Sequence, residues 1–93
     1  MEDKTLNMTL LFDFFGDLLT EKQREYFDLY YNEDLSLSEI AENAGISRQG
    51  VRDLIVRAEN FLLETERKTG IVARFEQMKR EIDRLERQYK EEG

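Results

Sequence analysis

Three arginines and a glutamine occur close together near the middle of the chain. Arg48, Arg52 and Arg57 lie within a stretch of ten residues that also holds Gln49 and a single acidic residue, Asp53. Arginine forms bidentate hydrogen bonds with guanine, and glutamine forms them with adenine. Arg48 and Arg52 are four residues apart, so they would share one face of a helix. This stretch therefore carries side chains suited to reading bases or binding phosphates.

The charge of the rest of the chain opposes contact with phosphate. The net charge is −7, and it is unevenly distributed: residues 1–46 hold 3 basic and 11 acidic side chains, net −8, whereas residues 47–93 hold 11 basic and 10 acidic, net +1. Distant acids are mostly screened beyond a Debye length of about 8 Å. We therefore expect weak binding by one copy and stronger binding by a dimer, which doubles the contacts.

The arginines fall within a pattern typical of a helix-turn-helix motif. In SLSEIAENAGISRQGVRDLI, residues 36–55, Ala41 supplies the small residue needed where the two helices approach, and Gly45 tolerates the positive φ of the turn. The apolar positions of the motif are filled by Ile40, Ala44, Ile46, Val51 and Leu54. The second helix of this motif enters the major groove, and its early outward residues make the contacts. The residues expected to bind nucleic acid are Ser47, Arg48, Gln49, Arg52 and Arg57.

The whole chain is predicted to be an all-α, five-helix domain. It contains no proline, and 38% of its residues are charged, a composition that favours helices with ion pairs on their surfaces. Thr20 with Gln23, and Ser36 with Glu39, have the form of capping boxes at helix starts. The expected helices span about residues 5–15, 21–31, 37–43, 48–67 and 71–90.

Two of these helices carry apolar residues that allow more than one interpretation. The first helix has more apolar residues than one face can hold, so it is either wedged in the core or also docks on a partner. The aromatic residues of the second helix, among them Tyr26 and Tyr31, could stack on bases, but their helical spacing and acidic surroundings favour the core. We expect residues 1–67 to form the helix-turn-helix domain and residues 68–93 a helical arm of the same compact unit.

The last expected helix carries one narrow apolar stripe. Its apolar residues recur at alternating steps of four and three, as in a coiled coil. The stripe could be covered by the helix at 48–67, folded back at Gly70, or by a second chain. Most apolar residues of that helix are committed to the motif, which leaves mainly Phe61, Leu62 and Thr65 to pair with the stripe. We therefore favour a coiled-coil-like homodimer. Its contacts would be Phe75, Met78, Ile82, Leu85 and Tyr89.

Several classes of protein are disfavoured by composition. The chain has no histidine and no cysteine, so it lacks the commonest general base, the commonest metal ligand and any thiolate metal site. It also has no glycine-rich phosphate-binding loop. We expect no enzyme activity, no catalytic residue, no metal and no cofactor. Acidic residues interrupt the apolar N-terminal run, unlike a signal peptide, and no stretch is long enough to span a membrane, so we expect a cytoplasmic protein with no membrane partner.

Residues 18–62, with the preceding MTLLFDFF, resemble the YlxM family of small bacterial helix-turn-helix proteins. The elements LLTEKQ, LYY, SLSEIAE and SRQ carry the resemblance, which extends over residues 4–66. The central part of that family is itself similar to region four of sigma factors. Gly50 and Asp53 stand where sigma region four usually has arginine and glutamine, which argues against reading promoters as a sigma factor does.

The resemblance implies an all-helical and often dimeric protein without catalytic residues. Members occur in Gram-positive bacteria and are encoded beside the signal recognition particle GTPase Ffh or its receptor FtsY, which implies a role in that protein-targeting pathway. Two hypotheses follow. The first is a regulatory protein that binds DNA or the signal recognition particle RNA. The second is an interaction module that binds the targeting GTPase through its first helix and last stripe, without nucleic acid.

Overall fold

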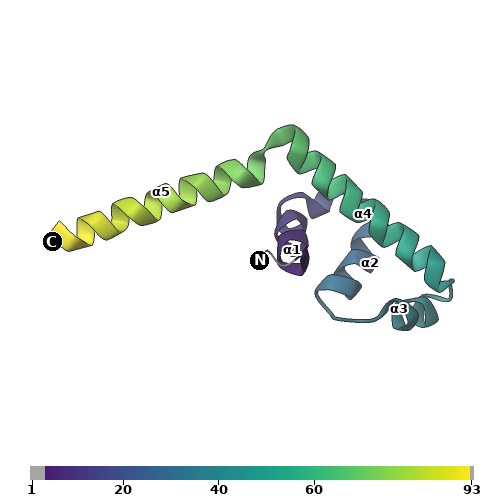
Figure 1. Ribbon diagram of the computed structural model, residues 1–93. Coiled ribbons are helices and arrows are strands. Elements are labelled where there is room, and N and C mark those ends of the chain that lie inside the picture. Colours follow the sequence, from purple (N-terminus) through teal and green to yellow (C-terminus); the bar gives the residue numbers. More distant parts are fainter. Residues whose placement is uncertain (1–3, 93) are drawn as a thin grey trace.

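The computed structural model describes residues 4–92 and is all-α in this range (Figure 1). These residues contain no strand. They form five α-helices, so the predicted fold class is confirmed. The elements in chain order are α1 (Lys4–Phe15), the short 3-10 helix η1 (Gly16–Leu18), α2 (Glu21–Tyr31), α3 (Leu37–Ala44), α4 (Arg48–Thr69) and α5 (Ile71–Glu92).

Three helices begin at the side-chain caps that the sequence predicts. The Thr20 hydroxyl accepts the Gln23 N–H at 3.2 Å, and the Gln23 side chain accepts the Thr20 N–H at 3.1 Å. Ser36 and Glu39 repeat this capping box at α3. The Ser47 hydroxyl accepts the Gly50 N–H at 3.0 Å and caps α4. Each cap satisfies amide groups that have no partner within their helix, so it fixes the residue at which the helix starts.

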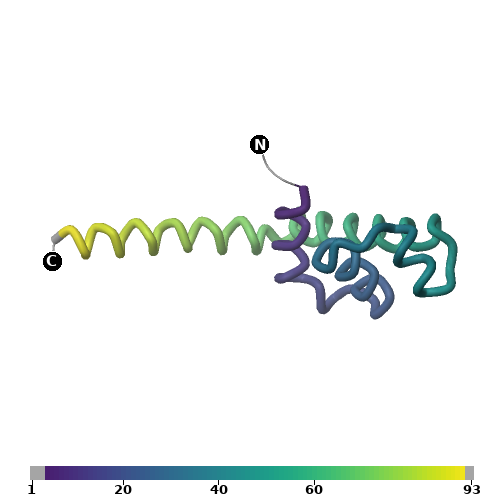
Figure 2. The backbone as a smooth tube through the Cα atoms, turned by 90° about the horizontal axis from the view of Figure 1, so that it is seen from below, coloured from purple at the N-terminus to yellow at the C-terminus, as the bar shows by residue number. Residues whose placement is uncertain are grey.

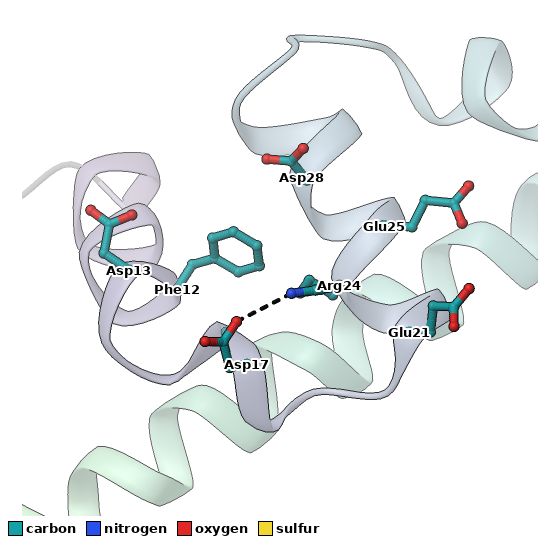
Figure 3. A pocket seen from close by; sticks show the side chains of 8 residues that line it. Phe12, Asp13, Asp17, Glu21, Arg24, Glu25 and Asp28 are labelled. Carbon is teal, nitrogen blue, oxygen red and sulfur yellow. Dashed lines mark hydrogen bonds and ion pairs between the residues drawn. The ribbon is translucent and has the colours of Figure 1, made fainter.

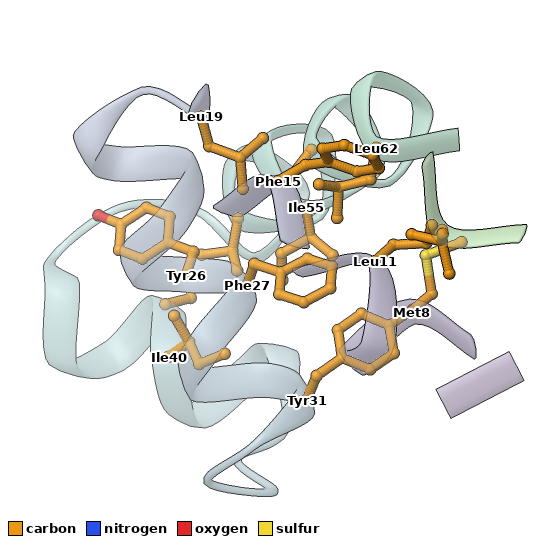
Figure 4. Packing of buried hydrophobic residues seen from close by; sticks show 14 residues of the cluster. Met8, Leu11, Phe15, Leu19, Tyr26, Phe27, Tyr31, Ile40, Ile55 and Leu62 are labelled. Atoms are coloured by element: carbon orange, nitrogen blue, oxygen red, sulfur yellow. The ribbon is translucent and has the colours of Figure 1, made fainter. Parts of the chain in front are cut away.

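Helices α1 to α4 share one hydrophobic core (Figure 4). Phe27 of α2, Ile40 of α3 and Val51 and Leu62 of α4 are fully buried. The ring of Phe27 stacks on that of Phe12 with 4.7 Å between centroids. Helices α2, α3 and α4 therefore pack around the same buried residues, and α4 contributes two of them.

Three of the four aromatic residues of α2 belong to this core, and the fourth, Tyr30, is 37% exposed. Tyr26 and Tyr31 are buried with Phe27, so the core interpretation is confirmed over a base-stacking surface. The first helix is likewise a core helix, because Met8, Leu11 and Phe15 are buried in the same cluster.

The apolar surplus of the N-terminal region is visible at two leucines. Leu6 of α1 is 68% exposed and Leu18 of η1 is 63% exposed. Helix α1 is therefore wedged in the core, yet α1 and η1 each leave an apolar side chain on the surface.

Helix α5 leaves the body at Gly70 and projects away from it (Figures 1 and 2). Gly70 adopts a left-handed conformation with φ +63°, which ends α4. The carboxylate of Glu66 accepts the N–H groups of Val72 at 2.9 Å and Ala73 at 3.0 Å, and so caps the start of α5. This arrangement gives the described chain its elongated extents of 60 × 26 × 24 Å.

One of the three α4 residues expected to be free to pair with the stripe of α5 is occupied by the core instead. Leu62 was expected to be free to pair, but it is fully buried in the core. Only the first turns of α5 contact the body: Val72 is buried, and Phe75 packs edge-on against Phe14 with 5.1 Å between ring centroids. Within residues 4–92, α5 does not fold back along α4.

Among these residues, no helix is both long enough and apolar enough to cross a membrane.

Candidate nucleic-acid interface

Helices α3 and α4 and the turn between them have the backbone geometry of a helix-turn-helix. Gly45 has φ +72°, and its N–H donates to the Ala41 carbonyl at 2.9 Å. The Ile46 N–H donates to the same carbonyl at 3.2 Å. Ala41 is buried where the helices approach, so both predictions for the turn hold.

Two of the apolar positions assigned to the motif core are exposed instead. Ala44 lies on the surface, and Ile46 is 41% exposed. Both residues follow the buried part of α3, beyond the edge of the core. Ile46 lies over the first turn of α4, where its Cδ1 atom would be 3.8 Å from a Cβ at Gly50. The apolar character of Ile46 thus covers the start of α4 rather than filling the core.

Arg48 and Arg52 form an exposed pair at the start of α4, which we call the arginine patch. Neither guanidinium has a hydrogen bond or ion pair with another residue of the described chain. The Ser47 hydroxyl accepts the cap hydrogen bond but keeps its own proton available for donation. The first turn of α4 contains no acidic residue. The N-terminal end of the α4 dipole therefore adds to the positive potential of the patch.

Gln49 is tethered beside the patch by an acidic neighbour. Its Nε2 atom donates to Asp53 Oδ1 at 2.9 Å, one turn further along α4. The amide must leave this carboxylate before it can pair with adenine. Gly50, between them, leaves room for the cap, since a Cβ at that position would lie 3.1 Å from the Ser47 hydroxyl oxygen.

Arg57 is exposed but does not join the other candidates. It follows Arg48 by nine residues, which places it about 13 Å along the helix axis and roughly half a turn around α4. The structure therefore brings Ser47, Arg48 and Arg52 together, keeps Gln49 beside them, and separates Arg57.

A strongly acidic hollow lies between α1 and α2, away from the patch (Figure 3). Its only cation, Arg24, pairs with Asp17 at 3.1 Å. The carboxylates that line it are those of Asp13, Asp17, Glu21, Glu25 and Asp28. The negative charge of this face disfavours contact with phosphate.

Sequence reasoning missed a polar link between α2 and α4. The Tyr31 hydroxyl donates to the Glu59 carboxylate, and the Lys4 ammonium lies 3.8 Å from the same carboxylate. Burial, reinforced by Glu59, raises the pKa of Tyr31 well above its ordinary value. The only signal in the sequence was a tyrosine on the core face of α2, because its partner lies 28 residues away.

No cluster of three or more acidic, histidine or cysteine side chains suited to a metal ion occurs in the described part of the chain.

The sequence of this chain is similar to those of several bacterial proteins. A family model described as "Putative helix-turn-helix protein, YlxM / p13 like" matches residues 2–93. A UPF0122 protein of Caldanaerobacter subterraneus subsp. tengcongensis is 52% identical over 85 residues, 91% of this chain and 73% of the relative. One of Halalkalibacterium halodurans is 52% identical over 91% of this chain and 78% of its own length. One of Bacillus cereus is 47% identical over 99% and 84%.

Proposed function

Since the chain belongs to the UPF0122 family of YlxM/p13-like helix-turn-helix proteins, we propose that it is a non-enzymatic regulatory protein that binds nucleic acid through the start of α4. The observation that carries this proposal is the arginine patch. Arg48 and Arg52 are exposed at the beginning of the second motif helix, and their charges are not neutralised by other described residues. In this motif, that position reaches base edges and phosphates.

Duplex DNA is the ligand that the geometry favours. The major groove of B-DNA admits an α-helix, whereas the deep and narrow major groove of A-form RNA does not. Ser47, Arg48 and Arg52 would contact phosphates or guanine, and Gln49 would contact adenine once it leaves Asp53. Arg57 would reach only a neighbouring phosphate. The signal recognition particle RNA is the second ligand, which would be bound through an exposed loop or its phosphates.

The cellular setting proposed is the signal recognition particle pathway in the cytoplasm. The resemblance to the YlxM family supports this setting, because it implies genes beside those for Ffh and FtsY. The acidic hollow supports a protein that binds nucleic acid through a limited surface, because the face between α1 and α2 would repel phosphate. No catalytic residue or cofactor forms part of the proposal.

The patch is tested by Arg48→Glu combined with Arg52→Glu, measured by titration of fluorescent duplex DNA and of the particle RNA at low salt. A matched control is Arg80→Glu with Arg87→Glu, which makes the same change of net charge at exposed positions of α5. We expect the patch variant to bind more than tenfold more weakly than the control. Equal affinities for the two variants would refute the patch as the binding site.

A second candidate function is favoured by the exposed apolar side chains. Leu6, Leu18 and the outer residues of α5 are available for a protein partner such as Ffh or FtsY. Leu6→Ser with Leu18→Ser should then abolish capture of the purified GTPase in the presence of nuclease. The matched control is Leu63→Ser, since Leu63 is also exposed but lies on α4. Capture of the GTPase by the arginine-patch variant, with no binding of nucleic acid by the unaltered chain, would favour this second function.

The proposal also includes a homodimer through α5. The four outer members of the stripe are largely exposed, from 50% for Leu85 to 79% for Tyr89. A helix with such a stripe buries it against another helix. Two copies would present two arginine patches, which raises affinity without new contacts in either copy.

A further inference from the structure

We propose that the α5 helices of two copies pair in antiparallel orientation, with Ile82 of each copy opposite Leu85 of the other. This inference rests on the homodimer in the proposed function and specifies its geometry. It follows from which residues of the stripe remain exposed and from the charges that flank them.

The exposed part of the stripe is its outer half. Ile71 and Phe75 lie next to the body, and Phe75 already packs against Phe14. The four residues beyond them are the most exposed of the stripe: Met78 62%, Ile82 52%, Leu85 50% and Tyr89 79%. In heptad notation, Met78 and Leu85 are d positions, and Ile82 and Tyr89 are a positions. A second copy that covers these four residues completes the stripe without displacing the contact with α1.

The charges beside the stripe oppose a parallel pair. In a parallel coiled coil, each g residue faces the e residue of the following heptad on the other helix. Arg74 would then face Lys79, and Glu81 would face Glu86. Every charged contact of this kind is between like charges, and each occurs twice in a symmetric dimer. A parallel pair therefore places like charges against each other at both of these contacts.

The same charges favour the antiparallel pair. With Ile82 opposite Leu85, Met78 lies opposite Tyr89, so four apolar layers form. In an antiparallel coil, e residues face e residues and g residues face g residues. Lys79 of each copy then faces Glu86 of the other, which gives two attractive pairs, and Glu81 faces the neutral Gln88. Apolar and charged positions thus agree on one arrangement.

Two other antiparallel alignments are less favourable. Placing Met78 opposite Ile82 puts Lys79 against Lys79 and Glu81 against Glu81 at the dyad. Placing Phe75 opposite Met78 depends on Arg74 pairing with Glu81 of the other copy. The Arg74 guanidinium already donates to the Thr69 carbonyl, and Glu81 already pairs with Arg84. Only the alignment centred between Ile82 and Leu85 uses charges that are free within the described chain.

The pairing places the two bodies at opposite ends of the joined helices, because each α5 projects away from its own body (Figure 1). The four layers extend over about 16 Å of each helix, so we expect the interface to be small. We therefore expect a dimer that dissociates on dilution. Its two arginine patches would lie far apart and would raise affinity only for a duplex long enough to contact both.

Cysteine cross-linking tests the orientation, because the chain contains no cysteine of its own. Met78→Cys mixed with Tyr89→Cys should form a disulfide-linked dimer under mild oxidation. Neither variant should do so alone, because the two copies of each residue are about 16 Å apart along the axis. Self-linking of Met78→Cys would show a parallel pair and overturn the proposal. Linking of Ile71→Cys to Tyr89→Cys, in place of the first pair, would overturn the register.

Charge reversal gives a second test with opposite signs for the two orientations. In the antiparallel pair, Lys79→Glu should weaken dimerisation by roughly tenfold, and adding Glu86→Lys should restore it. In a parallel pair, Lys79→Glu alone would strengthen the dimer by facing Arg74. Both are measured by sedimentation equilibrium without nucleic acid. Failure here leaves the arginine-patch titration unaffected, whereas a strictly monomeric chain would overturn the proposed dimer and this inference together.

Discussion

The Tyr31 hydroxyl and the Glu59 carboxylate join the end of α2 to the middle of α4. Glu59 has little exposure, with its side chain 12% accessible, and its carboxylate receives one hydrogen bond from Tyr31 and an ion pair from Lys4. Hydrogen bonds to charged groups contribute more than neutral ones, and loss of the donor leaves a poorly solvated acceptor. This hydrogen bond therefore helps to hold α2 against α4.

Tyr31→Phe should lower the free energy of unfolding by about 1–3 kcal/mol, because the Glu59 carboxylate loses its donor while the ring remains buried. Urea unfolding followed by circular dichroism measures the change. Tyr30→Phe is the matched control, since the Tyr30 ring is 37% exposed and packs beside Tyr31. Equal stability of the two variants would show that the link contributes nothing.

The raised pKa of Tyr31 predicts a specific dependence of stability on pH. The folded chain holds the phenol proton more tightly than the unfolded chain, in which the pKa is near 10.0. The contribution is therefore fully present below pH 10 and is lost as the pH rises above it. Unfolding measured between pH 9 and 11 should show stability falling more steeply for the natural chain than for Tyr31→Phe. Parallel curves would contradict the assignment.

At the scale of elements, the first turn of α4 depends on a single serine. The Ser47 hydroxyl satisfies the Gly50 amide and holds the arginine patch at the end of a regular helix. Ser47→Ala should cost about 1 kcal/mol of stability and weaken binding of nucleic acid. Ser38→Ala, inside α3 and exposed, should change neither. Thermal unfolding and the DNA titration check both effects, and identical behaviour of the two variants would rule out the cap as a determinant.

The junction between α4 and α5 depends on Glu66 in the same way. Its carboxylate is the acceptor for two amides at the start of α5. Glu66→Ala should increase hydrogen exchange at Val72 and Ala73 by about tenfold, because those amides become free to exchange. Glu64→Ala is the control, since Glu64 forms only exposed ion pairs with Arg67 and Lys68. Unchanged exchange would mean that Gly70 alone sets the junction.

How far the elements could be predicted depends on the distance between interacting residues. The caps at Thr20, Ser36 and Ser47 each join residues three positions apart, so they could be predicted from the local sequence. Gly45 was readable because its turn demands a positive φ. The burial of Ile46 was predicted wrongly, because burial depends on where the core ends rather than on motif position.

Longer-range features could not be derived from the sequence. The Tyr31 to Glu59 hydrogen bond spans 28 residues and requires α2 and α4 to pack first. The direction of α5 depends on the hydrogen bond between the Glu66 carboxylate and the Val72 amide, on the other side of Gly70. Leu62 is buried in the core and is not free to pair with α5. For the candidate site, the sequence identified its residues but not the separation of Arg57 or the tether between Gln49 and Asp53.

At the scale of the whole molecule, charge and apolar surface are divided among three regions. The hollow between α1 and α2 is acidic, the start of α4 is cationic, and the outer half of α5 is apolar on one side. In the proposed function, this division would direct a nucleic acid to the start of α4 and a second copy to α5. It also limits affinity, because few cations face the ligand while the net charge is −7.

The dependence of DNA affinity on salt tests the arginine patch most directly. The logarithm of the binding constant, plotted against the logarithm of salt concentration, should have a slope of only a few units for the natural chain. Arg48→Glu with Arg52→Glu should reduce the magnitude of that slope by about two, while Arg80→Glu with Arg87→Glu leaves it unchanged. Equal slopes and equal affinities for all three proteins would contradict binding through the start of α4.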